Sequence, residues 1–155
     1  WMPPDTKLYR NLVQCVKSFG TNGVRAVLWH QGESDSLVKT PAATYCDRQR
    51  AIMEALNGDC GYKLSWFVAQ ASFHPGSKEP EQKEVAKGQQ MLWEKKLAFK
   101  GAITDDLLGD THRSDGVHFN QAGLSAHAQR WFDVLKTHYR WKTTSAKKPS
   151  GLAGK

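Results

Sequence analysis

The chain has 155 residues, about the length of one domain. Its hydrophobic fraction of 39% is typical of a globular protein, and no apolar run approaches the roughly 20 residues that cross a bilayer. The net charge is +7, and four of the lysines follow Trp141 in a stretch without acidic residues. Such a basic end is typical of a solvated tail, and no motif indicates nucleic-acid binding. We expect one folded domain over residues 1–141, a flexible basic tail over 142–155, and neither nucleic acid nor membrane as a partner.

The start of the chain and its cysteines limit what can be predicted about its origin. Trp1 is not preceded by an initiator methionine and no signal-peptide pattern follows, so we expect further sequence upstream and predict no compartment. Three cysteines cannot all pair with one another, and no CxxC motif indicates a zinc or redox site. Cys15 lies on an apolar stripe and is predicted to be a small core residue.

The first half of the chain predicts a helix, a strand and a second helix. Apolar residues at helical spacing predict a first helix that begins at a cap residue, Asp5, and stops at Gly20. The stripe comprises Leu8, Leu12, Cys15 and Phe19. The apolar run 24–29 predicts a buried strand, and a polar loop follows it to residue 39. Thr40-Pro41 is typical of a helix start, and that helix is expected to run to about Leu56.

The second half predicts two more strands and two more helices. Residues 64–71 predict a strand, residues 81–97 a charged helix with Gly88 as a weak point, and residues 102–104 a short third strand. A loop runs to about Phe119, and a last helix follows. Its apolar face is predicted to hold Leu124, His127, Trp131, Val134, Leu135 and His138. Trp66, Trp93 and Trp131 are expected in the core rather than as platforms for a sugar.

The alternation of helices and strands indicates the fold class. Strands that alternate with helices predict a parallel sheet with helices packed on its faces. Three strands make a thin sheet, so we expect that strands and connections precede this chain. In open parallel sheets, binding sites form beyond the carboxyl ends of the strands. Two of these ends carry most of the functional groups, namely the segments 29–35 and 110–120.

The segment Asp115-Gly116-Val117-His118 is the first candidate for catalytic chemistry. A carboxylate three residues before an imidazole can accept a hydrogen bond from Nδ1–H, which leaves Nε2 free to take a proton from a nucleophile. Gly116 allows the tight turn that this contact needs. The spacing alone is equally compatible with Asp115 as a helix cap and His118 as a polar loop residue. A zinc site formed by these two residues with His112 is a weaker alternative.

The segment Gln31-Gly32-Glu33 is the second candidate. The Gln31 amide can donate an N–H to a developing oxyanion, Gly32 allows a substrate to approach the backbone, and Glu33 can hold the loop by accepting hydrogen bonds from amides. A solvated turn is the alternative for this segment. His30 beside it is equally compatible with a contact to substrate and with a structural role.

Together the two segments resemble a known family. Trp29-His30-Gln31-Gly32-Glu33-Ser34-Asp35 and Asp115-Gly116-Val117-His118 are similar to the W-H-Q-G-E-x-D and D-x-x-H blocks of the sialate O-acetylesterase and carbohydrate-esterase branch of the SGNH-hydrolase superfamily. The segment 104–107 also resembles that branch, and the resemblance extends over about residues 1–135.

The resemblance implies a fold, an activity and roles for individual residues. The fold is a flavodoxin-like α/β/α sandwich, and the activity is hydrolysis of acetyl esters on a carbohydrate or sialic acid, with no metal or organic cofactor. His118 is implied as the base, Asp115 as the residue that orients it, and Gln31 as an oxyanion donor.

One part of the family pattern is missing from the chain. The blocks that carry the nucleophilic serine and a backbone oxyanion donor do not occur, so we expect an upstream segment to supply them. No loop serine lies on a strand-to-helix turn of the required kind; those considered are Ser34, Ser36, Ser72, Ser77 and Ser114. A non-catalytic carbohydrate-binding or structural fragment that keeps the esterase scaffold is therefore the alternative function.

Overall fold

The computed structural model describes residues 1–4 and 6–140. The elements in chain order are α1 (Lys7–Ser18), β1 (Val27–Trp29), α2 (Glu33–Leu37), α3 (Ala42–Cys60), β2 (Trp66–Gln70), α4 (Glu79–Glu94), β3 (Phe99–Ile103), α5 (Gly109–His112) and α6 (Gln121–Tyr139). The tail predicted over 142–155 lies outside the described residues. Within the described residues, no helix is both long and apolar enough to cross a membrane.

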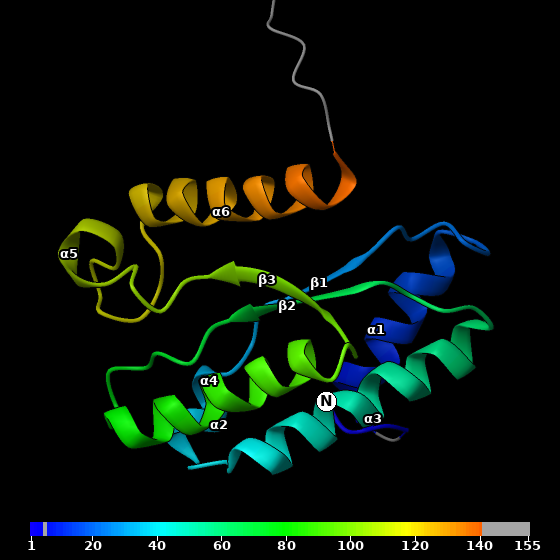
Figure 1. The fold of residues 1–155 in the computed structure, drawn as a ribbon, viewed down its shortest axis with the longest axis horizontal. Coiled ribbons are helices and arrows are strands. Elements are labelled where there is room, and N and C mark those ends of the chain that lie inside the picture. Colours follow the sequence, from blue (N-terminus) through cyan, green and yellow to red (C-terminus); the bar gives the residue numbers. More distant parts are fainter. Residues whose placement is uncertain (5, 141–155) are drawn as a thin grey trace, which may run out of the picture.

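The three strands form one sheet in the order β1-β2-β3, and both pairs are parallel. Val27 pairs with Trp66, and Phe67 pairs with Phe99. Helix α6 covers one face of the sheet, and α3 and α4 lie on the other (Figure 1). The predicted parallel α/β fold with helices on both faces is confirmed, and its layers are those of a flavodoxin-like sandwich.

Strand β2 is buried because it is central and apolar on both faces. Trp66 and Val68 pack into the larger cluster with residues of α1, α3 and α4, whereas Phe67 and Ala69 pack against Trp131 of α6. Alternate residues of a strand point to opposite faces, so one apolar run joins two cores. The core roles predicted for Trp66 and Trp131 are confirmed.

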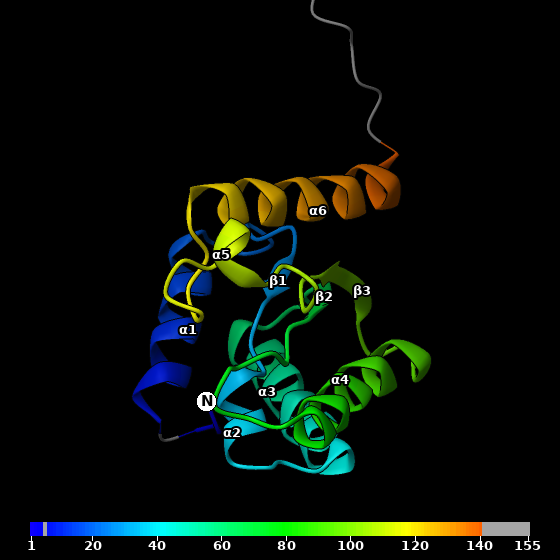
Figure 2. The ribbon, with the colours of Figure 1, turned by 90° about the vertical axis from the view of Figure 1, so that its left-hand side faces the viewer.

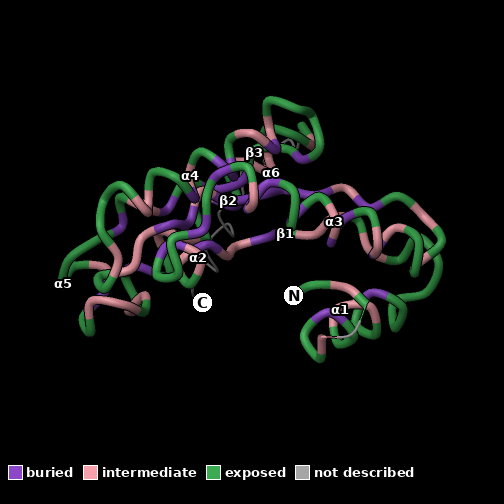
Figure 3. The backbone as a smooth tube through the Cα atoms, turned by 90° about the horizontal axis from the view of Figure 1, so that it is seen from below, coloured by how far each residue is buried: buried purple, intermediate pink, exposed green. Residues whose placement is uncertain are grey.

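Helix α1 differs from its prediction in the face that it buries. Tyr9 and Val16 are its buried residues, whereas Leu8, Cys15 and Phe19 are exposed, so the prediction that Cys15 is a core residue is wrong. Figure 3 shows α1 beside α3 with mostly exposed positions. The helix packs on α3 rather than on the sheet centre, and this contact selects the face that carries Tyr9.

The limits of several other elements also differ from the predictions. Helix α3 begins at Ala42, because the Thr40 hydroxyl donates to Asp35 instead of capping the helix, and it continues to Cys60. Gly61, with φ of 75°, ends it in the left-handed conformation that glycine favours. Helix α4 continues without a break through Gly88, the predicted weak point. A Cβ there would lie 2.8 Å from the Ala42 carbonyl oxygen, so glycine permits the close packing of α3 and α4.

The two predicted loops each contain a short helix, α2 and α5. Thr6 is the N-cap of α1, while the predicted cap, Asp5, lies outside the described residues. Along α6, Trp131, Val134 and Leu135 face the sheet. His138 is exposed overall but packs its ring against Phe67 and Phe99 of the sheet, as predicted, whereas Leu124 is exposed. Figure 2 looks onto the edge of the sheet at which α5 and the loop before α6 lie.

Candidate active site

The loops that follow the three strands meet at one edge of the sheet, as expected for parallel strands (Figure 2). Asp105 lies in the loop after β3 and connects that loop to the loop after β2. Its carboxylate accepts hydrogen bonds from the Ser72 N–H at 2.6 Å, the Ser72 hydroxyl at 2.7 Å and the Phe73 N–H at 3.0 Å. These bonds hold the loops after β2 and β3 together at the edge where the two candidate segments also lie.

The Asp115–His118 hydrogen bond is present in the structure. His118 Nδ1 lies 2.7 Å from one Asp115 carboxylate oxygen, and the other oxygen accepts from the N–H groups of Val117 at 2.8 Å and His118 at 2.7 Å. The hydrogen bond to the His118 side chain, followed by those to the two backbone amides, holds the pKa of the Asp115 carboxyl far below its usual range. Gly116 makes the turn with φ of 76°, as predicted.

The alternative role of Asp115 as a helix cap does not fit the structure. Asn120 is the N-cap of α6, and its side-chain oxygen accepts from the Gly123 N–H at 2.9 Å. The carboxylate of Asp115 is therefore committed to its own turn and to His118. The His118 side chain is 83% exposed, so its Nε2 is open to solvent or to another group.

Arg113 holds the Asp115–His118 turn in place through a buried side chain. It was not among the predicted site residues. It is 5% exposed, donates from Nε to the Leu107 carbonyl at 2.8 Å, and donates from Nη1 to the Val117 carbonyl. Its guanidinium lies 3.9 Å from the centre of the Phe119 ring. Burial lowers the pKa of Arg113, while the nearby carboxylates of Glu33, Asp105 and Asp115 oppose this effect. The sequence signal for this role was an arginine in a predicted loop, between the acidic residues Asp110 and Asp115.

Gln31 is held on both its backbone and its side chain. Its amide Nε2 donates to Asp35 at 2.6 Å, and its carbonyl accepts from the Tyr45 hydroxyl at 2.7 Å and from Gln89 Nε2 at 3.0 Å. Gln89, on α4, is fully buried and also bonds both backbone groups of Ala71, at 3.1 Å each. It therefore joins the ends of β1 and β2. The sequence signal was a glutamine on the buried face of that helix.

Gly32 and Glu33 shape the turn that follows Gln31. A Cβ at Gly32 would lie 2.0 Å from the Ala71 carbonyl oxygen and 2.6 Å from Gln89 Nε2, so glycine is needed for this close packing. The approach of substrate to its backbone stays a prediction. Glu33 Oε2 accepts from the Gly32 N–H at 3.0 Å, as predicted. Burial raises the pKa of Glu33, but hydrogen bonds from His30 and from backbone amides outweigh it, and the net pKa is lowered.

His30 lies between the two candidate segments, and its ring contacts other protein side chains. Its Nε2 lies 3.3 Å from Glu33, and its Nδ1 lies 3.3 Å from Nε2 of His127, which accepts from the Trp131 indole at 2.9 Å. The His30 ring also contacts Phe119, the residue after His118. Of the two open roles for His30, these contacts favour the structural one.

The structure brings the two segments together but does not join their key side chains. Among the described residues, no hydrogen bond connects His118 with Gln31 or with a serine. Gln31 lines a cavity of about 140 Å³ between β1, α3 and residues 1–2, and His118 is not among the residues that line it. A shared groove for these two side chains stays a prediction.

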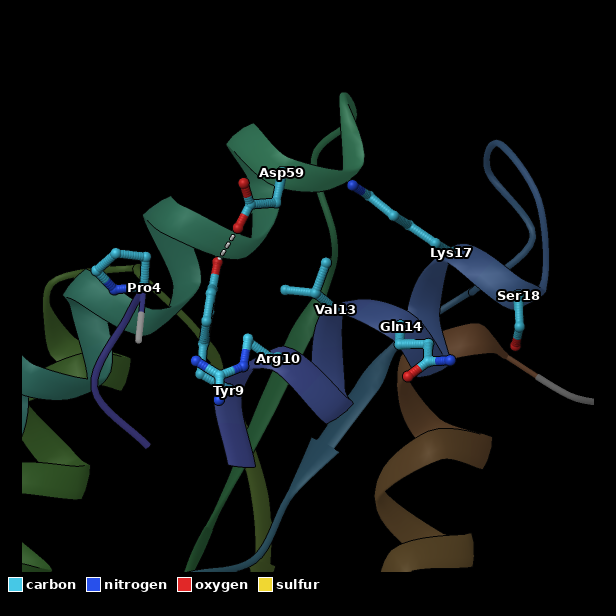
Figure 4. A pocket seen from close by; sticks show the side chains of 8 residues that line it. All are labelled: Pro4, Tyr9, Arg10, Val13, Gln14, Lys17, Ser18 and Asp59. Carbon is cyan, nitrogen blue, oxygen red and sulfur yellow. Dashed lines mark hydrogen bonds between the residues drawn. The ribbon is translucent and has the colours of Figure 1, made fainter. Parts of the chain in front are cut away.

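Two other kinds of site were considered in the described residues. No group of three or more histidine, cysteine, aspartate or glutamate side chains among residues 1–4 and 6–140 is arranged to hold a metal. A larger cavity of about 560 Å³ lies between α1 and α3, where the Tyr9 hydroxyl donates to Asp59 at 2.5 Å (Figure 4). None of the predicted site residues lines it.

These features define a parallel α/β protein with a hydrogen-bonded Asp–His pair at the carboxyl edge of its sheet. The model of the family described as carbohydrate esterase, sialic acid-specific acetylesterase, matches residues 1–137. The chain therefore belongs to this family of carbohydrate esterases, as the two sequence blocks predicted. Comparisons with curated proteins and with solved structures gave no significant match.

Proposed function

We propose that the chain carries the acid–base part of a serine esterase that removes O-acetyl groups from a carbohydrate or sialic acid. The observation that supports this function best is the 2.7 Å contact between His118 Nδ1 and the Asp115 carboxylate. That contact fixes the tautomer in which Nε2 is an unprotonated base. The carboxylate also stabilises the imidazolium that forms when Nε2 takes a proton.

In the proposed mechanism, His118 Nε2 takes the hydroxyl proton of a serine as the serine oxygen attacks the acetyl carbonyl. Gln31 Nε2 has two N–H groups, of which one donates to Asp35, and the other is assigned to the developing oxyanion. His118 then gives its proton to the departing sugar oxygen. Water removes the acetyl group from the serine, again with His118 as base.

The nucleophilic serine is proposed to come from a segment outside the described residues. The serines of the neighbouring loops have other commitments: Ser72 bonds to Asp105, Ser36 donates to the Ser72 carbonyl, and Ser114 accepts from Asn120. The 83% exposure of the His118 side chain leaves room for a further segment to cover it.

The same exposure and the lack of a serine partner in the described residues favour the second candidate function. It is a non-catalytic carbohydrate-binding or structural fragment that keeps the esterase scaffold. Hydrolysis that depends on His118 separates the two functions.

The test is an esterase assay on p-nitrophenyl acetate, with a serine-directed phosphonate as a covalent probe. The chain is assayed alone and together with the segment that precedes it in its gene. The proposal expects turnover and labelling only when that segment is present. His118→Ala should then lower turnover by several orders of magnitude, and Asp115→Asn by less.

His112→Ala is the matched control, because His112 lies at the end of α5, just before the same turn, and its Nδ1 is 3.3 Å from the Leu108 carbonyl oxygen rather than from Asp115. It should retain nearly full turnover. Labelling of a serine of this chain would show that the nucleophile lies within it. If His118→Ala keeps the unmodified rate, the assignment of the base is wrong and the non-catalytic alternative gains support.

A further inference from the structure

The cavity of about 140 Å³ beside Gln31 contains an unpaired buried amide. Gln49 lines it, is only 3% exposed, and its Nε2 has no hydrogen-bond partner among the described residues. The other buried positions of α3 are mostly apolar, and Gln49 lies in the middle of this stripe. An unsatisfied buried amide destabilises the folded state, so its presence there needs an explanation.

A second donor without a partner lines the same cavity. The indole N–H of Trp29 interacts with the nearby Tyr45 hydroxyl, but the two groups do not meet hydrogen-bond geometry, and the N–H has no other partner among the described residues. Trp29 is 6% exposed, and the ring of Trp1 packs edge-on against it with centroids 5.0 Å apart. The cavity thus combines two unused N–H donors with aromatic walls.

The charged groups at the cavity compensate one another. Asp35 accepts from Gln31 at 2.6 Å and from Thr40 at 2.7 Å, and it lies 3.8 Å from Arg48. Its carboxylate is therefore engaged by neutral donors and by a cation. The cavity offers N–H donors and apolar walls without net charge, which suits a neutral group with a carbonyl oxygen.

The volume limits the size of such a group. At roughly 30 Å³ for each water in the liquid, the cavity of about 140 Å³ accommodates a few heavy atoms. An acetyl or acetamido group has this size. Its carbonyl oxygen would accept from the two donors, and its methyl group would contact Ile52 and the indole rings.

We propose that this cavity is a subsite that binds a neutral acetyl or acetamido group, with Gln49 and Trp29 as donors to its carbonyl oxygen. The assignment of that group to an acetylated sugar rests on the proposed function. The subsite itself rests on the two unpaired donors and the apolar walls.

The test is a titration of the ¹⁵N-labelled chain with acetamide, followed through the side-chain amide signal of Gln49 and the indole N–H signal of Trp29. Acetate serves as the anionic probe of the same size. Saturable shifts of both signals with acetamide, and at least tenfold weaker binding of acetate, are expected. An absence of saturable shifts, or a preference for acetate, would overturn the proposal.

Two variants and one control make the site specific. Gln49→Leu and Trp29→Phe should each weaken acetamide binding by at least tenfold, while Gln90→Leu, at an exposed position of α4, should leave it unchanged. Gln49→Leu should also raise the melting temperature, because it removes an unpaired buried amide from an apolar stripe. Unchanged binding in both variants would show that acetamide binds elsewhere, and would also overturn the proposal.

The titration uses no ester and measures no turnover. Its failure would therefore leave the esterase proposal intact, and an inactive enzyme would leave a positive titration intact.

Discussion

Replacement of Gln89 by leucine tests how the two strand-end loops are held together. The side chain makes four hydrogen bonds within the described residues: two with Ala71, one with the Gln31 carbonyl and one with the Tyr45 hydroxyl. Leucine has a similar size but no polar atom. The variant would leave both backbone groups of Ala71 without this partner in a buried place, since Ala71 is 2% exposed.

The magnitude follows from those two groups. Each buried polar group that loses its partner costs about 1–3 kcal/mol, so Gln89→Leu should lower the free energy of unfolding by about 2–6 kcal/mol. For a domain of this size, 1 kcal/mol lowers the melting temperature by roughly 2–4 °C. Calorimetry or circular dichroism should therefore show a decrease of roughly 4–24 °C.

Gln90→Leu is the matched control, because it makes the same substitution at the next position of α4. Gln90 is exposed, and within the described part of the chain its side chain bonds to Glu94 alone, at 2.7 Å. Its replacement should change the free energy of unfolding by less than about 0.5 kcal/mol. If the two variants melt within a degree or two of each other, Gln89 does not hold the loops together.

Three further predictions concern packing, burial and pH. Gly32→Ala should destabilise the protein in thermal melts by about 1–3 kcal/mol, because the added Cβ would collide with a backbone oxygen 2.0 Å away. Gly58→Ala is the control, since its Cβ would have open space around it, and it should be neutral or stabilising. Tyr9→Phe should cost about 1–3 kcal/mol in urea denaturation because it loses the bond to a carboxylate of α3, whereas Tyr62→Phe should cost nothing, since that buried hydroxyl has no partner in the described residues. Burial, followed by neighbouring cations, lowers the pKa of His127, so the fold favours its neutral form. The stabilisation from neutral His127 should be complete above about pH 6.5 and should decline as the pH falls through the lowered folded-state pKa. If the melting temperature of His127→Gln falls with acid as steeply as that of the unmodified protein, this reasoning is refuted.

The sequence by itself determined the fold class and the position of the chemistry. Short apolar runs separated by helical patterns are sufficient to indicate a parallel sheet, because parallel strands require helical crossovers. Local chemistry was also readable: Asp115 and His118 are three residues apart around a glycine, so their hydrogen bond depends on a single turn. The alternation of strands and helices placed both candidate segments after strands; in the structure residues 31–33 directly follow β1, whereas residues 115–118 follow β3 only after α5.

Only the tertiary structure decided which faces are buried and which distant residues meet. The stripe of α1 was misjudged because Tyr9 reaches Asp59, fifty positions away, and helical periodicity contains no information on such a partner. Arg113 and Gln89 hold the candidate loops by donating to backbone carbonyls. Every residue type has a backbone carbonyl, so the sequence does not indicate which residues accept these bonds. The unpaired donor of Gln49 likewise becomes visible only when the cavity around it is formed, because hydrogen-bond satisfaction depends on the whole three-dimensional surrounding of an atom.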